Sequence, residues 1–492
     1  MKKYILIIIG LFTLGACNKW LALTPKSQVA SEDLFNSQEG FQEALNGVYT
    51  TASQGSLYGG ELTCGFLDVM AQNYTLSSLN DNLSYLQTQK INFNDANLIN
   101  RINNTWSGLY NAIVNTNLIL SHIDERKGVF QNNQYALIKG EALALRAYFH
   151  FDLFRMFGSS MVSTGTPVGI PYVTTYSNKV TTTSSPKEVI KNILADLNDA
   201  KALLKTSDPI IDSTYKVGYP ANDTTTENDN PSLFLQDRRY RMNYYAVCGE
   251  LARVYLYEAD KTNALANALE VINSDKFPFT RQGDLNNSDP TLQDKILYKE
   301  ILFGWYIPKE IDSLHSRFEE GTASLYLAPS DALYIYETNS VGGEDLRYKD
   351  WFKAGADLNL NLIKYARNPN GTTQTDETLN PYPQTAPAIR LSEMYYIAAE
   401  SSFDANPIKA LSYLNAVRSA RGIITSLTTT NKSDFMKELI KDARKEFYGE
   451  GQIFYMYKRL NQSIVGQGGL IIPASAKIFI IPKPNNEIEF GG

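Results

Sequence analysis

Apolar residues recur at helical spacing through most of this chain. In segments 102–120 and 138–156 they fall at i, i+3, i+4 and i+7, the pattern of an amphipathic helix. The connector around 128–133 is short and polar, so the two segments are predicted to form an antiparallel helix pair. The second helix is predicted to end near Gly158.

Similar helical patterns follow further along the chain. Pro186, with an acidic residue two positions later, marks a helix start, and apolar positions then line one face as far as Leu204. Residues 238–276 carry two apolar stripes separated by a turn, with small residues where the helices would cross, as in a tetratricopeptide hairpin. We also expect a helix pair within 389–422 and one last helix over about 433–460.

Strand patterns are few and short. Residues 300–307 are rich in β-formers, 360–365 is a second candidate, and a short terminal strand is expected within 470–484. Stretches rich in Pro, Gly, Asn, Asp and Thr are predicted to be loops, namely 206–233, 306–328 and 366–388.

These elements predict a mainly α fold, in which tetratricopeptide-like helix hairpins pack against an irregular, loop-rich lobe with a few short strands. Such hairpins cannot bury their apolar faces alone, so they must stack on one another. We expect one domain over 17–492, with a helical scaffold at about 35–276 and 389–460 and the loop-rich lobe at about 277–388.

The first residues form a targeting segment. Residues 4–14 are an apolar run of 11 residues after two lysines, which suits a signal peptide and is too short to cross a bilayer. The run leads into Leu14-Gly15-Ala16-Cys17, a lipobox. We expect removal of 1–16 and a lipid anchor on Cys17; the alternative is an ordinary signal peptide with a coincidental cysteine. No later apolar run approaches the roughly 20 residues of a spanning helix.

The charge argues against one class of partner. The formal net charge is −6, and it becomes −8 once Lys2 and Lys3 leave with the signal peptide. An acidic chain without a basic run is a poor nucleic-acid binder, because phosphate contacts need clustered Lys and Arg. The 31 Tyr and 22 Phe residues suit surfaces that stack on rings as well as a core.

Catalytic and metal-binding signals are weak. His122, His150 and His315 share no metal-ligand spacing, and no protease, hydrolase, phosphate-loop or Cys-x-x-Cys motif occurs. We therefore expect no metal, no cofactor and no catalysis. A hydrolase remains an alternative, because the separation of two glycosidase carboxylates, about 5 to 9 Å, depends on the fold.

Several polar residues within the helix patterns have a structural interpretation. We expect buried ion pairs between helices rather than ligand contacts for the following residues: Arg146, Arg390, Glu400, Arg418, Glu446, Glu450 and Arg459. Cys64 and Cys248 are expected to be buried free thiols, a disulfide being the alternative. Trp106 falls on an apolar helix face and is expected in the core.

Six segments, in order, resemble the SusD/RagB family. They are Cys17 to Pro25 with Phe41 and Gly47-Val48-Tyr49; Trp106-Ser107-Gly108-Leu109-Tyr110 with Ile113 and Asn117; Ala142 to Tyr148 with Phe157-Gly158; Arg390-Leu391-Ser392-Glu393-Met394-Tyr395 with Ala399-Glu400; Leu414 to Gly422; and Arg444 to Gly451. With the final Ile481-Pro482-Lys483-Pro484, the resemblance spans the whole mature chain.

The resemblance implies a function. Family members are outer-membrane lipoproteins with four tetratricopeptide-like helix pairs, and they cover a SusC-like TonB-dependent transporter. They bind oligosaccharides, or peptides in some relatives, and are not catalysts. We therefore expect a lipid-anchored, surface-facing outer-membrane protein that delivers a glycan to such a transporter. Peptide capture and a purely protein-binding scaffold are the alternatives.

Two regions are expected to contact the ligand, because ligand contacts in the family often come from them. The first is the stretch 68–74, which offers Asp68, Gln72 and Tyr74. The second is the loop after the predicted strand 300–307, which offers Tyr306, Phe318 and Tyr326. Aromatic rings stack on the C–H faces of sugars, and carboxylates and carboxamides bind sugar hydroxyls.

Overall fold

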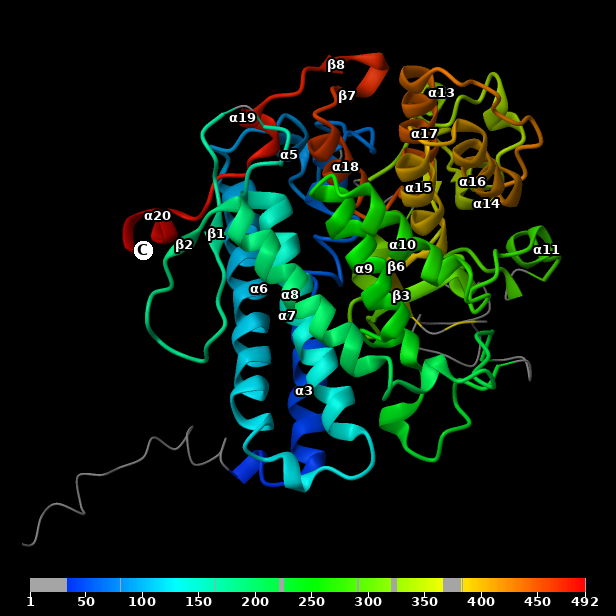
Figure 1. The fold of residues 1–492 in the computed structure, drawn as a ribbon. Helices are drawn as coiled ribbons and strands as arrows, with labels where there is room; N and C mark the ends of the chain where they lie inside the picture. The colour runs from blue at the N-terminus through cyan, green and yellow to red at the C-terminus, as the bar shows by residue number, and fades with distance from the viewer. Residues whose placement is uncertain are drawn as a thin grey trace, which may run out of the picture.

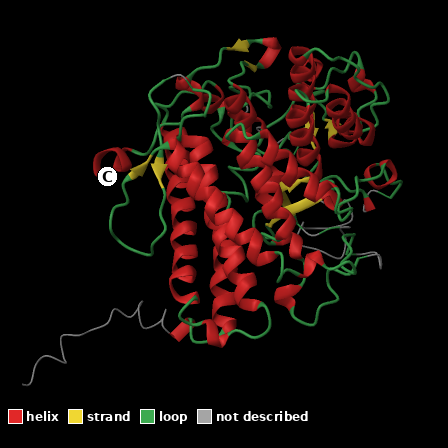
Figure 2. Ribbon diagram, viewed as in Figure 1, coloured by secondary structure: helices red, strands yellow, loops and turns green. Residues whose placement is uncertain are grey.

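The computed structural model describes residues 33–491, apart from 80, 164, 221–224, 290–291, 320–324, 366–381 and 383. Helices dominate these residues, and the strands pair two by two (Figure 2). This is the mainly helical fold that the sequence predicts. The expected signal peptide and Cys17 lie outside the described residues.

Four long helices lie side by side (Figure 1). They are α3 (Gln38–Ala52), α6 (Ala96–Ile123), α7 (Gln134–Phe157) and α8 (Pro186–Leu204). The predicted pair is confirmed as α6 and α7, and α7 ends before Gly158. Side-chain caps fix the helix starts: Asp95 accepts from two backbone N–H groups of α6, and Ser185 forms a capping box with Glu188 at α8. Helix α7 is buried along almost its whole length.

A second set of helices continues the array. It consists of α9 (Tyr244–Tyr257), α10 (Lys261–Ile272), α15 (Leu391–Ser402) and α16 (Pro407–Ala420). Helix α8 packs on α9, α9 on α10, α10 on α15, and α15 on α16. Both predicted hairpins are confirmed. Helices α10 and α15 are neighbours although residues 273–390 separate them, so this long segment leaves the array and returns to it.

A two-stranded antiparallel sheet crosses the middle of the molecule. Strand β3 (Ile301–Tyr306), which the sequence predicts, pairs with β6 (Thr385–Arg390) and packs on α9. The prediction of a loop over 366–388 is wrong at its end, where β6 begins. Pro387 is the reason that the sequence does not indicate a strand here. Proline is tolerated in β6 because each strand of a two-stranded sheet has one unpaired edge.

Several further elements are short. They are α4 (Phe66–Met70), α5 (Leu86–Gln89), α11 (Gln282–Leu285), α12 (Ile311–Ser316), α13 (Pro329–Ile335), α14 (Leu346–Trp351), α19 (Ala476–Phe479), α20 (Asn485–Phe490), β1 (Ile170–Pro171) with β2 (Thr183–Ser184), β4 (Phe352–Ala354) with β5 (Leu360–Leu362), and β7 (Ile464–Val465) with β8 (Ile471–Ile472). Strands β5 and β8 confirm parts of the predicted segments 360–365 and 470–484. Helix α12 shows that the loop predicted over 306–328 is partly wrong.

The prediction of one last helix over about 433–460 is wrong. This segment forms two helices, α17 (Lys432–Glu446) and α18 (Ile453–Leu460). Gly449 and Gly451 between them have φ of +77° and +69°, a region that other residues rarely adopt. A Cβ at Gly451 would lie 2.2 Å from the carbonyl oxygen of Leu62, so the chain needs glycine there. The break lets Glu450 turn toward the neighbouring strands.

A buried ion-pair cluster joins distant segments at this break. The carboxylate of Glu446 at the end of α17 binds three guanidinium groups, those of Arg347 (2.9 Å), Arg390 (2.5 Å) and Arg421 (2.6 Å). All four side chains are at most 1% exposed. Burial opposes ionisation of Glu446, but the charges of Arg421 and Arg390 prevail and hold its pKa well below the usual value.

The other expected ion pairs are also present. Glu450 binds Arg390 (2.9 Å) and also Lys364, Arg418 lies 3.5 Å from Asp442, and Arg146 of α7 binds Asp196 of α8 at 2.6 Å. Cys64 and Cys248 are buried and free, and Trp106 is 7% exposed, as predicted. These polar residues therefore connect helices to one another inside the protein.

We expect Glu446→Gln to lower the free energy of unfolding by about 3–5 kcal/mol, because it leaves buried guanidinium charge without its carboxylate. Urea titration followed by circular dichroism measures the change. The matched control is Asp404→Asn, which removes an exposed partner of Lys261 and Lys432 and should cost no more than about 1 kcal/mol. Equal effects of the two variants would contradict the central role of Glu446.

Candidate functional site

A surface depression of about 280 Å³ lies where α3, the chain before α9 and the end of β3 meet. Four aromatic residues, two carboxamides and two charged groups contribute to its lining: Tyr49, Tyr240, Trp305, Tyr306, Asn46, Gln236, Asp237 and Arg241. Of the residues predicted to bind a ligand, Tyr306 is the one that lines this depression.

Strand alternation places Tyr306 at the surface. Successive strand residues point to opposite faces, so Trp305 turns inward and is 1% exposed, whereas Tyr306 is 39% exposed. The indole of Trp305 stacks on Tyr58 with ring centroids 4.4 Å apart. Tyr306 lies beside Tyr240 at 5.5 Å, which gives the depression a pair of adjacent rings.

Hydrogen bonds to Glu141 and Asn46 fix the half-buried guanidinium of Arg241 at one wall. Its Nε donates to Glu141 (2.9 Å) and its Nη1 donates to Oδ1 of Asn46 (2.9 Å). Burial opposes ionisation of Glu141, but Arg238 and Arg241 prevail and hold its pKa below the usual value. Tyr49 donates to the same carboxylate at 2.8 Å. Tyr49 and Asn46 are thus held in place by hydrogen bonds before any ligand arrives.

Three of the predicted ligand residues lie in the core. Asp68, Tyr74 and Phe318 are 0%, 1% and 2% exposed. Tyr74 donates to Asp68 (3.1 Å), and its ring lies 5.8 Å from that of Phe318. Their assignment as ligand contacts stays a prediction, and a ligand would reach them only after these contacts open.

The last two predicted residues lie near this cluster. Gln72 is 7% exposed and donates to the carbonyl of Gln89 (2.7 Å). Tyr326 is half-buried, and its carbonyl accepts from the N–H of Thr75 (2.7 Å). The structure therefore brings the 68–75 segment and the chain near Tyr326 together, but none of these residues lines the depression around Tyr306.

Most residues of the depression were not predicted from the sequence. Asn46 and Tyr49 lie on α3, one turn apart, while Gln236, Asp237 and Arg241 lie just before α9. The dense run of charged and aromatic residues over 237–241 is the one local signal that could have drawn attention to them.

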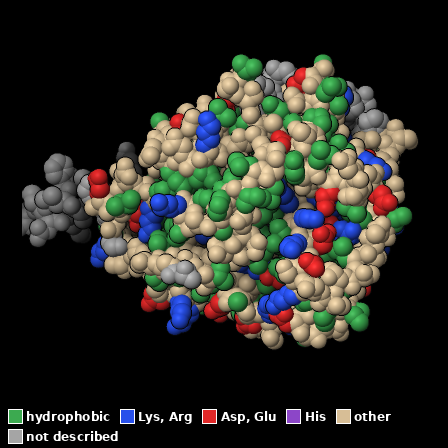
Figure 3. All heavy atoms as spheres, turned by 90° about the horizontal axis from the view of Figure 1, so that it is seen from above, with side chains coloured by type: hydrophobic (Ala, Val, Ile, Leu, Met, Phe, Trp, Pro, Cys, Tyr) green, Lys and Arg blue, Asp and Glu red, His purple; other side chains and the backbone are tan. Residues whose placement is uncertain are grey.

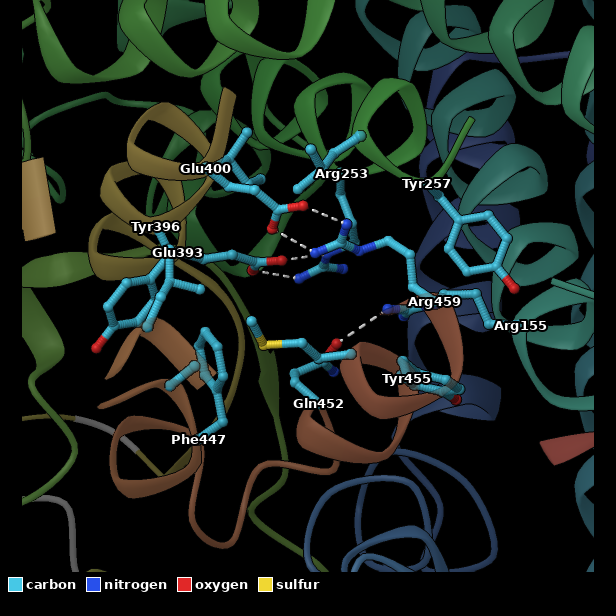
Figure 4. Close-up of a pocket in the computed structure, with 15 residues that line it drawn as sticks. Arg155, Arg253, Tyr257, Glu393, Tyr396, Glu400, Phe447, Gln452, Tyr455 and Arg459 are labelled. Atoms are coloured by element: carbon cyan, nitrogen blue, oxygen red, sulfur yellow. Dashed lines mark hydrogen bonds and ion pairs between the residues drawn. The ribbon is translucent and has the colours of Figure 1, made fainter. Parts of the chain in front are cut away.

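A second hollow, of about 70 Å³, lies inside the helix array (Figure 4). Charged side chains from different helices point toward one another across it: Arg459 of α18 binds Glu400 of α15 (2.7 and 2.6 Å), and Arg253 of α9 binds Glu393 of α15 (2.7 and 2.6 Å). This confirms the expected Glu400–Arg459 pair. The volume is far below the roughly 300–1,000 Å³ of ligand pockets, so this site holds helices together.

The histidines have no metal-site arrangement. His150 is fully buried, its Nδ1 lies 2.8 Å from the carbonyl of Arg146, and its Nε2 accepts from the N–H of Val173 (2.9 Å). Burial lowers its pKa to about 3, so it is neutral. Within the described ranges, no group of three metal-binding side chains occurs, and no helix is long and apolar enough to cross a membrane.

Comparison with known families identifies the fold. Residues 19–216 match a SusD-like family described as starch-binding and associating with the outer membrane, and residues 355–490 match the SusD family itself. The chain belongs to the SusD/RagB family. Members of this family are non-catalytic glycan-binding proteins, so the prediction that the protein is not an enzyme is confirmed by its family.

Individual relatives cover nearly the whole chain. Two SusD-like proteins of Formosa agariphila are 23% and 26% identical over 95% and 99% of this chain, and 94% and 97% of their own lengths. A SusD superfamily crystal structure from Bacteroides thetaiotaomicron matches with a TM-score of 0.68 at 24% identity, covering 92% of this chain and 98% of its own. A SusD-like carbohydrate binding protein from Bacteroides vulgatus matches with a TM-score of 0.70 at 17% identity, covering 92% and 96%.

We expect Asp68→Asn to change how stability depends on pH. Burial raises the pKa of Asp68 to about 7, above the unfolded value, so its contribution is present at low pH and is lost as pH rises through 7. In the variant the amide oxygen accepts from Asn73 and Gly451, the amide NH2 group donates to the Tyr74 hydroxyl in place of accepting from it, and the side chain does not ionise. The stability of the wild type relative to the variant should therefore fall between pH 5 and pH 8, as measured by urea titration. A stability difference between wild type and variant that does not depend on pH would contradict titration of the buried Asp68 carboxyl in this range.

Proposed function

We propose that this protein captures an oligo- or polysaccharide at the outer membrane and delivers it to a SusC-like TonB-dependent transporter. The observation that carries the proposal is the depression in which Tyr306 and Tyr240 lie beside fixed carboxamide and charged groups. Sugar rings offer C–H faces to aromatic side chains, and their hydroxyls bind to such polar groups. The name of the Bacteroides vulgatus carbohydrate binding protein supports the same ligand class.

The domain organisation fits this role. We propose that residues 17–492 act as one domain, in which 35–276 and 389–460 form the scaffold and 277–388 supplies part of the ligand-binding surface. The depression combines both parts, because Trp305 and Tyr306 come from the second and its other lining residues from the first.

We further propose a lipid anchor on Cys17 and a surface-facing position in the outer membrane. The lipobox and the family's association with the outer membrane support both. Hydrophobic side chains gather near the middle of the face seen from above (Figure 3). Exposed apolar residues of the described chain include Leu333 and Tyr334 on α13 and Leu470 and Ile471 near β8. Apolar surface of this kind favours protein–protein contact and supports the proposed transporter partner.

We expect Tyr306→Ala to weaken glycan binding about ten-fold, equivalent to ~1.4 kcal/mol, because the exposed stacking ring is lost. Affinity electrophoresis of the full chain in detergent, against amylopectin, xylan, mannan, laminarin and pectin, identifies the glycan and measures the change. The control is Tyr334→Ala, which removes a similarly exposed ring (50%) outside the depression. Unchanged binding in Tyr306→Ala would exclude this depression as the site.

We expect Cys17→Ala to abolish lipidation, because the thiol is the acceptor of the lipid. Metabolic labelling with a palmitate analogue should mark the wild type and not the variant, and the variant should leave the outer-membrane fraction. Cys64→Ala is the control, since that thiol is buried. Labelling that persists in Cys17→Ala would contradict the lipobox interpretation.

A further inference from the structure

A larger groove, of about 900 Å³, runs along the outer side of α6. Its walls are α6, the chain over 171–181 and the C-terminal segment from Pro484 to Gly491. Figure 1 shows α6, β1, β2 and α20 together at one side of the molecule. The groove shares no lining residue with the depression around Tyr306.

Asparagine side chains from two distant parts of the chain line this groove. Helix α6 contributes Asn103, Asn104 and Asn111, and the start of α20 contributes Asn485 and Asn486. Positions 104 and 111 are seven residues apart and so lie on one face of the helix. Asparagine is a poor helix former, and Asn104 and Asn111 are exposed, so core packing does not account for them.

The floor of the groove is formed by the half-buried ring of Tyr110 and by the small exposed edge of Trp106, which is otherwise in the core. Trp106 and Tyr110 lie between the asparagines on α6, with ring centroids 4.9 Å apart. The hydroxyl of Tyr110 donates to the carbonyl of Pro171 (2.9 Å), which fixes the ring against the opposite wall. A rigid aromatic floor can contact the C–H groups of a sugar. The carboxamides beside it can donate to and accept from the sugar hydroxyls.

The lining is almost neutral. Among its described residues, Lys179 and Glu487 are the ionisable groups other than tyrosine, and their charges are opposite. A groove without net charge gives no electrostatic preference for an acidic polymer, so an uncharged ligand suits it best.

From this arrangement we infer a second carbohydrate site: the α6 groove binds a stretch of a neutral polysaccharide while the Tyr306 depression binds another. The inference rests on the proposed glycan-capture function. Two sites on one protein that engage the same chain raise the overall affinity well beyond that of either site, by up to about 10²–10⁴-fold.

The test compares groove variants with depression variants on the same polysaccharides. The double variant Asn104→Ala/Asn111→Ala removes two carboxamides, and Ser107→Trp fills the groove from α6. Alanine favours the helix, so the double variant should fold. The control is Asn100→Ala, an exposed asparagine on α6 that does not line the groove. Retardation of each full-length protein in detergent is measured in gels that contain the five polysaccharides named above.

We expect both groove variants to lose about ten-fold in apparent affinity for the polysaccharide that retards the wild type, with Asn100→Ala unchanged. Combination with Tyr306→Ala should remove retardation altogether. Binding that is lost in Tyr306→Ala and unchanged in both groove variants would overturn the groove site and leave the proposed function intact. A wild type that no polysaccharide retards would contradict the proposed function, and the inference with it.

Discussion

The buried carboxylate of Glu446 is the contact on which the rest of the structure most depends. Its partners come from segments far apart in the sequence: Arg347 lies on α14, Arg390 ends β6, and Arg421 follows α16. Arg421 also binds Glu300, the residue before β3. A buried charge without partners costs several kcal/mol. Moving one of these segments away from the others would leave such a charge, so the ion pairs hold the segments together. Distant parts of the chain are thereby kept in one arrangement.

That constraint explains how a helix array can contain a long insertion. Helices α10 and α15 must remain neighbours although residues 273–390 lie between them. Glu300 precedes β3, and Arg390 is the last residue of β6. The cluster therefore anchors the sheet at the end away from Tyr306. The sheet then carries Trp305 into the core and Tyr306 to the surface. Charges at the far end of β3 thus help to position Tyr306, an aromatic side chain of the candidate site.

Much of the fold could be predicted from the sequence, because helices leave a periodic pattern. Segments 102–120 and 238–276 show it clearly, and their helices form as expected. The break between α17 and α18 was missed, since periodicity does not register the positive φ of Gly449 and Gly451. Strand β6 was missed because Pro387 resembles a loop signal. The site was harder still: Tyr306 was predicted, but Asn46 and Arg241 meet only through a tertiary contact that no local pattern contains.

The Tyr306 depression and the α6 groove have a similar lining, which the net charge of the whole chain does not indicate. The chain is acidic overall, yet the depression is lined by one acidic and one basic residue, Asp237 and Arg241, and the α6 groove by Glu487 and Lys179. The net negative charge of the chain therefore lies outside these two concave surfaces, which stay close to neutral. Rings and carboxamides line both of these concave surfaces. For the proposed delivery of a ligand to a transporter, several weak contacts are an advantage over one strong contact, because each can be broken in turn.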